Sequence, residues 1–242
     1  MTVERSIYDF ALEFIVFFFG LGVFFVPSSI PFNWWIIPSV SFLLFLLEFR
    51  KATRRNLEIA LVIGVFLMVF DFAFENVGTL VFGYWGTSGS SFFVLAVPIE
   101  VMLTCFFGGT SWALYVLSAH ALFVSRYGGH SNRPLRFSLI LLDLFFFGAG
   151  GAAAEWCLIQ RGVMHYAVGW TTPHAFVAYL ATWTMLHTLL NRLTPLNTEH
   201  TDEAEGNIRL SRETDFAPRL RHISKQACMV HGWVPFSRNW NS

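Results

Sequence analysis

The stretch FDFAFENVGTLVFGYWG, residues 70–86, ends a long apolar run and carries two carboxylates, Asp71 and Glu75. Residues four apart in a helix lie on the same face, so both acids share one side of a hydrophobic helix. An ionisable group inside a membrane span costs about 2.5–3.5 kcal/mol on insertion scales. The stretch therefore predicts a membrane helix and raises the question of what its acidic end does.

The composition of the whole chain favours the same class of protein. Of its 242 residues, 55% are hydrophobic and 13% are charged, whereas soluble domains carry about 25% charged residues. The mean hydropathy is +0.53. The net charge of zero does not indicate a nucleic-acid partner. The three cysteines have neither the spacing of metal ligands nor that of a disulfide framework. We expect a polytopic membrane protein in contact with membrane lipid.

The apolar runs predict an all-α transmembrane helical bundle of about six spans. Crossing the hydrocarbon core takes about 20 residues. The candidate spans are residues 7–26, 34–48, 57–76, 92–119, 136–156 and 173–192. No A-x-A-like cleavage site follows the first run, so we interpret it as a retained helix rather than a signal peptide.

The distribution of basic residues predicts the orientation of this bundle. Arginines and lysines concentrate in the segments 49–56 and 120–136 and in the tail, whereas the segments 27–33 and 77–91 hold none. The positive-inside rule then places both termini in the cytoplasm. The sequence thus divides into a transmembrane bundle at 1–192 and a polar cytoplasmic tail at 193–242, whose composition is typical of a flexible segment.

In this layout a set of acids and histidines converges on the outer level of the membrane: Asp71, Glu75, Glu100, Glu155, His165 and His174. Glu100 is the most telling of them, because apolar residues flank it on both sides. Glu75 and Glu155 are equally compatible with an interfacial position that has no catalytic meaning. Asp143, near mid-depth in its span, is compatible either with function or with a carboxylate that is hydrogen-bonded inside the bundle.

A weak internal repeat supports the convergence. Each of two acids is followed by a glycine, aromatic residues and a proline that opens the next span: Glu75 by Gly83, Tyr84, Trp85 and Pro98, and Glu155 by Gly162, Tyr166, Trp170 and Pro173. Two helix-hairpin units that face each other would place paired acids around a shared cavity. The tryptophans at the outer boundaries, Trp34, Trp35, Trp85 and Trp170, predict an interfacial aromatic belt.

The segment from Phe70 to Phe107 resembles the integral-membrane lycopene cyclases and the related carotenoid hydratases. The matching features are an acid near a span end, the Gly83-Tyr84-Trp85 group, and a helix that opens with Pro98-Ile99-Glu100. The resemblance extends at the level of pattern over residues 57–192. Val101 and the Pro173-His174-Ala175 opening depart from the family's pattern, so an isoprenoid other than lycopene is as compatible as lycopene itself.

The resemblance implies a redox-neutral cyclisation or hydration of a carotenoid or other isoprenoid, without cofactor or metal. Protonation of a C=C bond needs a carboxylic acid that stays neutral, and burial favours the neutral form. Glu100 would be this acid, and Glu75, Glu155 or Asp71 its partner. Aromatic faces would shelter the carbocation. The residues expected to bind the substrate are Tyr84, Trp85, Tyr166 and His174.

Two other classes of function remain open from the sequence. Glu75, Glu155, His165 and His174 are also ligand types for a metal-dependent membrane enzyme, although no H-E-x-x-H motif is present. Acids inside a membrane also serve proton relays in transporters, and a lipid-binding membrane protein needs no catalysis. The sequence does not set the oligomeric state.

Overall fold

The computed structural model describes residues 7–24, 32–123, 133–167 and 169–194. With the exception of Thr194, these residues belong to the unit Met1–Leu193. The tail predicted at 193–242 therefore lies almost wholly outside the described residues, as do parts of the segments predicted to connect the spans.

Six α-helices make up most of the described chain, and four short strands lie between them. The helices are α1 (Ile7–Phe24), α2 (Ile36–Phe49), α3 (Arg54–Asn76), α4 (Ile99–Phe123), α5 (Arg133–Gln160) and α6 (Thr172–Leu193). A π-helix, η1 (Val77–Val81), continues α3. The strands are β1 (Trp85–Thr87), β2 (Phe93–Val94), β3 (Val97–Pro98) and β4 (Met164–Tyr166). Each predicted span overlaps one of these helices, so the prediction of a helical architecture is confirmed.

The fourth helix begins later than predicted, and the backbone explains the difference. Residues expected at the start of the 92–119 span instead form the antiparallel pair of β2 and β3. Leu95, in the turn between these strands, has a φ of 57°, a left-handed conformation that is rare for a residue with a side chain. Pro98 ends β3, and α4 starts at the next residue.

Three helices of the described chain are long and apolar enough to cross a membrane: Arg54–Val81, Ile99–Leu122 and Pro134–Gln160. They correspond to α3 with η1, to α4 and to α5. Helices suit this environment because they satisfy their backbone hydrogen bonds internally. The helices α1, α2 and α6 are not among these three.

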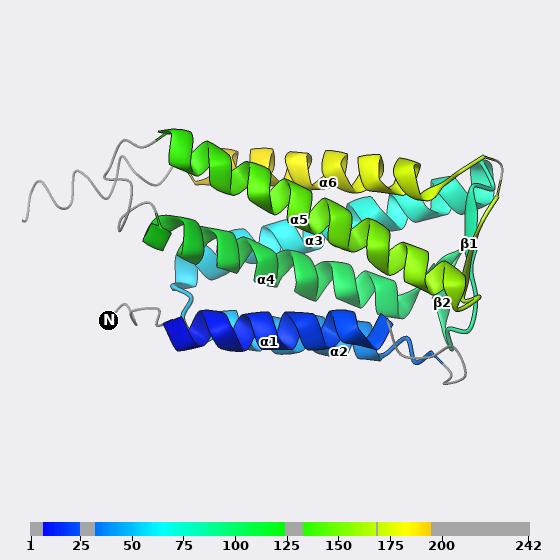
Figure 1. Ribbon diagram of the computed structural model, residues 1–242, viewed down its shortest axis with the longest axis horizontal. Helices are drawn as coiled ribbons and strands as arrows, with labels where there is room; N and C mark the ends of the chain where they lie inside the picture. The colour runs from blue at the N-terminus through cyan, green and yellow to red at the C-terminus, as the bar shows by residue number, and fades with distance from the viewer. Residues whose placement is uncertain (1–6, 25–31, 124–132, 168, 195–242) are drawn as a thin grey trace, which may run out of the picture. The chain divides into compact units, whose positions relative to one another are not determined.

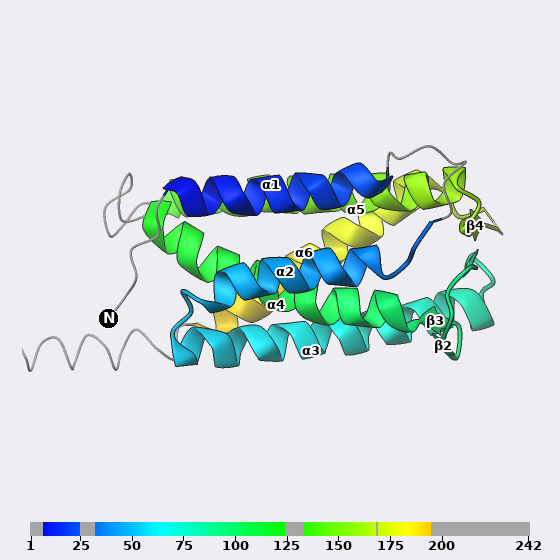
Figure 2. The same cartoon turned by 90° about the horizontal axis from the view of Figure 1, so that it is seen from below.

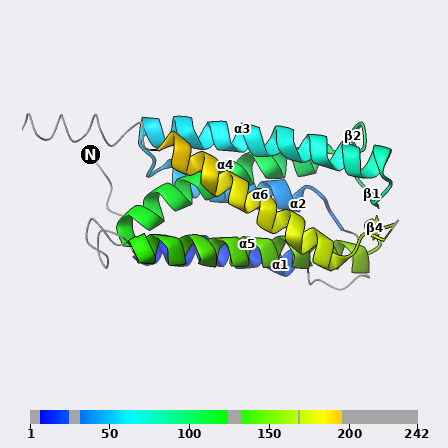
Figure 3. The ribbon, with the colours of Figure 1, turned by 90° about the horizontal axis from the view of Figure 1, so that it is seen from above.

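The helices pack as a ring. Each helix packs mainly against two neighbours, in the order α1, α2, α4, α3, α6, α5 and back to α1. Successive helices run up and down, and the strands gather at one end of them (Figure 1). Turned by 90°, the ribbon shows α1 beside α5 and α4 beside α3 (Figure 2). From the opposite side, α6 runs obliquely between α5 and α3 (Figure 3).

The main buried core lies between α3, α4 and α6. Ala60, Ile63 and Leu186 are fully buried there, and Trp112 and Leu190 belong to the same core. Gly64 allows the close approach of α3 to α4, because a Cβ at this position would collide with the side chain of Thr110. Small residues at helix contacts are the usual means of close packing in membrane bundles.

Candidate functional site

The ring of helices surrounds a cavity of about 630 Å³, and all six helices contribute to its wall. This volume lies in the range of small-molecule sites, about 300–1,000 Å³. Most of the wall is aliphatic or aromatic. Its acidic residues fall into two groups along the helices: Asp71, Glu75 and Glu155 near the ends that lead into the strands, and Glu13, Glu48 and Asp143 farther from those ends. We call the first group the carboxylate cluster.

The strands position two members of the carboxylate cluster. Trp85 Nε1 donates a hydrogen bond of 2.6 Å to Glu75 Oε2, and the Tyr166 hydroxyl donates one of 2.7 Å to Glu155 Oε2. Strands β1 and β4 pair antiparallel with Trp85 directly opposite Tyr166. The pairing therefore brings two acids that are far apart in the sequence to one place.

Glycines shape the chain between each acid and its hydrogen-bond donor. Gly83 and Gly162 follow the two acid-bearing helices and have φ values of 63° and 70°, which favour glycine. Within η1, a Cβ on Gly78 would run into the ring of Trp85. The corresponding glycines and the paired strands agree with the internal repeat seen in the sequence.

Asp71 is the third member of the cluster and lies one helical turn before Glu75. Its Oδ2 is buried without a hydrogen-bond partner, and the thiol of Cys105 on α4 lies against its side chain. The charge of Asp71 acts on Glu75 and on Glu155, so the three carboxyl groups are electrostatic neighbours. In this cluster Glu75 and Glu155 thus accept hydrogen bonds from aromatic side chains, whereas one oxygen of Asp71 is buried without a partner.

Aromatic rings border the carboxylate cluster. The ring of Trp85 lies 5.5 Å from that of Phe74 and 4.7 Å from that of Trp170. Tyr84 stacks on Trp170 with ring centroids 5.3 Å apart. Phe74, Trp85 and Trp170 line the cavity, whereas Tyr84 packs behind them. Three aromatic faces therefore stand next to the acids inside the cavity.

The predicted aromatic belt holds in part. Trp35 is 48% exposed, as a belt residue should be, but Trp34 and Trp85 are 3% and 4% exposed. Trp34 donates its indole hydrogen bond to the carbonyl oxygen of Ser88, beyond β1. For these two residues the interfacial interpretation was wrong, because they pack inside the protein at the strand end of the bundle.

Glu100 occupies a different place from the cluster. It is 1% exposed and accepts a hydrogen bond of 2.7 Å from the hydroxyl of Ser90, in the segment between β1 and β2. The cavity wall includes its neighbour Val101 but not Glu100 itself. The buried carboxylate expected from the sequence is therefore present, but it faces the segment before β2 rather than the cavity.

The two predicted histidines lie outside the cavity wall. The Nδ1 of His174 is 2.8 Å from the hydroxyl of Thr171 at the start of α6, and its ring lies 5.5 Å from that of Trp170. His165, on β4, packs against Gly86 on β1. In the part of the chain that the structure describes, no group of three His, Cys, Asp or Glu residues could hold a metal ion.

Tyr166 lies on β4, outside the helices. Burial raises the pKa of Tyr166, and its hydrogen bond to Glu155 and the charge of that carboxylate raise it further. The hydroxyl therefore stays protonated and remains a donor to Glu155 at neutral pH.

The sequence did not single out a second group of polar residues in the bundle. His120 Nε2 lies 2.7 Å from Asp143 Oδ2, and His187 Nε2 lies 3.7 Å from the same oxygen. Trp112 and Trp183 adjoin this group, with ring centroids 5.1 Å apart. We call these five residues the inner polar group. The signal that could have found it is the pair of histidines inside apolar runs on α4 and α6.

Comparisons with known proteins found no relative of this chain. The chain matches no protein-family model, no curated protein and no solved structure.

Proposed function

We propose that this chain is an integral membrane enzyme that protonates a C=C bond of an apolar isoprenoid or polyene and yields a cyclised or hydrated product. The observation that carries the proposal is the carboxylate cluster, three acids that meet on the wall of a largely apolar cavity. Proton transfer to a hydrocarbon needs an acid held where water does not compete. The surrounding aromatic rings suit a cationic intermediate.

The membrane layout belongs to the same proposal. We propose that all six helices cross the membrane, with both termini in the cytoplasm. The alternation of the helices and the place of Arg50, Lys51, Arg54 and Arg55 at the end opposite the strands support this orientation. The carboxylate cluster then lies toward the outer face.

Asp71 is the proposed proton donor. Its unpartnered Oδ2 suits a protonated carboxyl oxygen that faces the cavity, and three ionised acids side by side would repel one another. The proton moves from Asp71 to one carbon of the C=C bond, whose π electrons form the new C–H bond. The other carbon becomes a carbocation, and Asp71 is left as a carboxylate.

The carbocation then has two redox-neutral outcomes. In cyclisation, a second C=C bond of the same chain attacks it, a C–C bond forms, and the resulting cation loses a proton to a carboxylate. In hydration, a water oxygen attacks instead, and the proton lost comes from that water. Glu75 and Glu155 are the proposed proton acceptors, because Trp85 and Tyr166 hold them as hydrogen-bond acceptors beside Asp71.

This assignment changes the role first expected for Glu100. An acid that does not line the cavity has no direct contact with a substrate there, so the proposal gives Glu100 a positioning role. Its hydrogen bond with Ser90 ties the start of α4 to the segment between β1 and β2. That segment follows Trp85, which holds Glu75.

A second candidate function is transport or storage of an apolar lipid. The specific observation in its favour is the presence of acids at two separate places along one cavity, an arrangement that also suits a proton relay. In that case an isoprenoid would leave the protein chemically unchanged.

The test compares lipid extracts from cells with the wild-type chain, with Asp71→Asn and with Glu58→Gln. Glu58 is an exposed acid that pairs with Arg54 on the outside of α3, which makes it a matched control. The enzyme predicts a product that is isomeric with its substrate or heavier by one water, present with wild type and Glu58→Gln and absent with Asp71→Asn. A lipid that co-purifies unchanged with all three chains would support transport instead.

A further inference from the structure

The inner polar group contains two hydrogen-bond donors that the protein does not use. Trp112, on α4, is 3% exposed, and its Nε1 is buried without a partner, as is the Nε1 of Trp183 on α6. Both tryptophans line the cavity. Buried donors are nearly always hydrogen-bonded, and leaving one unpaired is unfavourable. Two such donors at one place call for an acceptor that the protein itself does not supply.

The same group of side chains also holds a carboxylate, which does not bond to these two donors. Asp143 lines the cavity from α5, with His120 Nε2 at 2.7 Å and His187 Nε2 at 3.7 Å from its Oδ2. The ring of His187 lies 4.8 Å from that of Trp112, edge to face. The inner polar group thus offers indole N–H donors and a carboxylate acceptor within one set of touching side chains.

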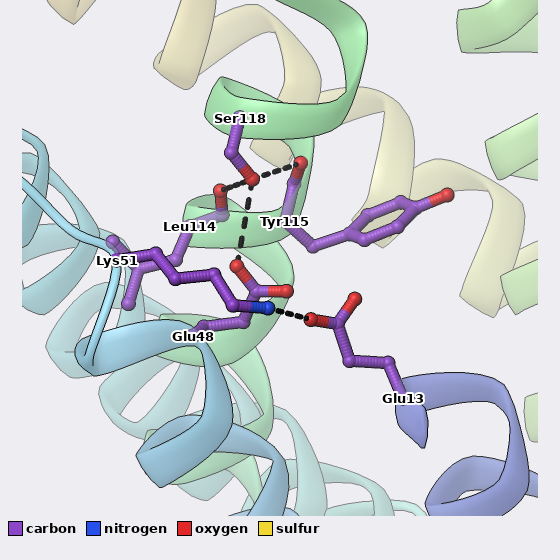
Figure 4. Close-up of polar contacts among 6 residues, drawn as sticks. All are labelled: Glu13, Glu48, Lys51, Leu114, Tyr115 and Ser118. Atoms are coloured by element: carbon purple, nitrogen blue, oxygen red, sulfur yellow. Dashed lines mark hydrogen bonds and ion pairs between the residues drawn. The ribbon is translucent and has the colours of Figure 1, made fainter. Parts of the chain in front are cut away.

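The charges around the inner polar group disfavour an anion. Glu13 and Glu48 line the same part of the cavity, whose described wall contains no lysine or arginine. The nearby Lys51 Nζ lies 2.9 Å from Glu13 Oε1. Figure 4 shows Lys51 directed at Glu13 and the hydroxyl of Ser118 directed at Glu48. A phosphate or carboxylate would meet three acids here, so the geometry favours an uncharged group.

The inner polar group and the carboxylate cluster lie far apart in one cavity. Asp143 and Glu155 both belong to α5, and their separation in sequence corresponds to about 18 Å along the helix at about 1.5 Å per residue. Apolar and aromatic side chains such as Leu67, Phe146 and Tyr179 line the wall elsewhere. This shape suits an extended chain with a different chemical group at each end.

We propose that the inner polar group binds the hydroxyl of a long-chain isoprenoid alcohol, whose far end lies at the carboxylate cluster. The hydroxyl oxygen accepts a hydrogen bond from the indole of Trp112 or Trp183, and its own hydrogen is donated to Asp143. A ketone has no hydrogen to donate, and an ammonium group has no lone pair to accept. The substrate class named here rests on the proposed function, whereas the binding of the alcohol does not.

The test measures binding rather than turnover. Purified protein in lipid nanodiscs is titrated with retinol, whose fluorescence reports an apolar site, and empty nanodiscs correct for partition into lipid. Bound retinol is then displaced with geranylgeraniol, with geranylgeranyl diphosphate and with the hydrocarbon of the same skeleton that lacks the hydroxyl. We expect the alcohol to compete about 5- to 10-fold better than the hydrocarbon, the value of one or two hydrogen bonds, and the diphosphate to compete least.

Variants locate the site. Trp112→Phe and Trp183→Phe keep an aromatic ring and remove the N–H, so each should weaken retinol binding about 3- to 10-fold. Trp156→Phe is the matched control, because Trp156 is 48% exposed on α5 and does not line the cavity. The measurement needs no product, so saturable retinol binding by the wild-type chain and its weakening in the tryptophan variants are expected even if the proposed function fails, which separates this inference from that function.

Several outcomes would overturn the inference. These are the absence of saturable retinol binding, equal competition by alcohol and hydrocarbon, and stronger competition by the diphosphate. The competition series uses the wild-type chain alone, so it decides the matter even if a tryptophan variant fails to fold.

Discussion

Trp85 and Tyr166 stand directly opposite each other on β1 and β4, and each donates a hydrogen bond to a different carboxylate of the cavity wall. The strands are only three residues long, too short to be stable by themselves. Their pairing joins the half of the chain that carries Glu75 to the half that carries Glu155. The geometry of the carboxylate cluster thus depends on this one cross-strand pair.

Removal of either donor should destabilise the protein. Trp85→Phe and Tyr166→Phe each take away a hydrogen bond to a partly buried carboxylate, which is worth about 1.5–3 kcal/mol if that carboxylate is charged. Thermal unfolding in detergent should show a lower midpoint for both variants. Trp156→Phe, on the exposed side of α5, should leave the midpoint unchanged. Unchanged midpoints for Trp85→Phe and Tyr166→Phe would show that the two hydrogen bonds do not hold the site.

The raised pKa of Tyr166 predicts that the free energy of unfolding depends on pH above about pH 10. The pKa of Tyr166 is raised above the ordinary tyrosine value of 10.0, first by burial and then by Glu155. Above about pH 10 the unfolded chain ionises its tyrosine while the folded protein keeps the proton, so stability contributed by Tyr166 is complete below pH 10 and declines above it. The difference in unfolding free energy between wild type and Tyr166→Phe should be constant from about pH 7 to pH 9 and shrink toward pH 11. A difference that grows over this range would contradict the assignment.

Glu100 and Asp71 should respond differently to amide replacement. Glu100→Gln keeps an oxygen that accepts the hydrogen bond of Ser90, so most of the activity should remain. Asp71→Asn removes the proposed proton donor and should lower the rate about 100- to 10,000-fold. Product formation is measured on preparations matched for folded protein by size-exclusion chromatography. The reverse order of the two losses would return the acid role to Glu100.

Gly78 should not tolerate alanine. A Cβ there would occupy the space of the Trp85 ring, and overpacking of this kind costs about 1–3 kcal/mol. We expect Gly78→Ala to lower the unfolding midpoint and to reduce activity, since Trp85 can no longer reach Glu75. Gly150→Ala on α5 is the control, because a Cβ at Gly150 meets nothing within 4 Å. Equal effects of the two substitutions would argue against a special role for the Gly78–Trp85 contact.

The orientation can be tested with single cysteines in a chain whose native cysteines are replaced. Ser88 is exposed beyond β1 and Arg54 is exposed at the start of α3. A membrane-impermeant thiol reagent applied to intact cells should modify Ser88→Cys and spare Arg54→Cys, because Arg54 belongs to a basic segment. Lysed cells serve as the control, in which both positions should react. Labelling of Arg54→Cys from outside would refute the proposed layout.

The sequence by itself determined the six helical segments and the places of the acids along them. Apolar runs of this length have few alternatives to a helix, and α3 extends over Arg54–Asn76 where a span was predicted at 57–76. The repeat of an acid followed by a glycine and an aromatic residue agrees with the pairing of Trp85 with Tyr166, although the sequence did not predict the strands themselves.

Only the tertiary structure decided which acids face the cavity. In a membrane bundle the lipid-facing and the protein-facing sides of a helix are both apolar, so hydropathy does not reveal which way a given residue points. For this reason the sequence did not reveal that Asp71 lines the cavity whereas Glu100 does not. It also did not reveal that Trp34 and Trp85 are buried. The inner polar group is the extreme case, since His120, Asp143 and His187 come from three different helices that only packing brings together.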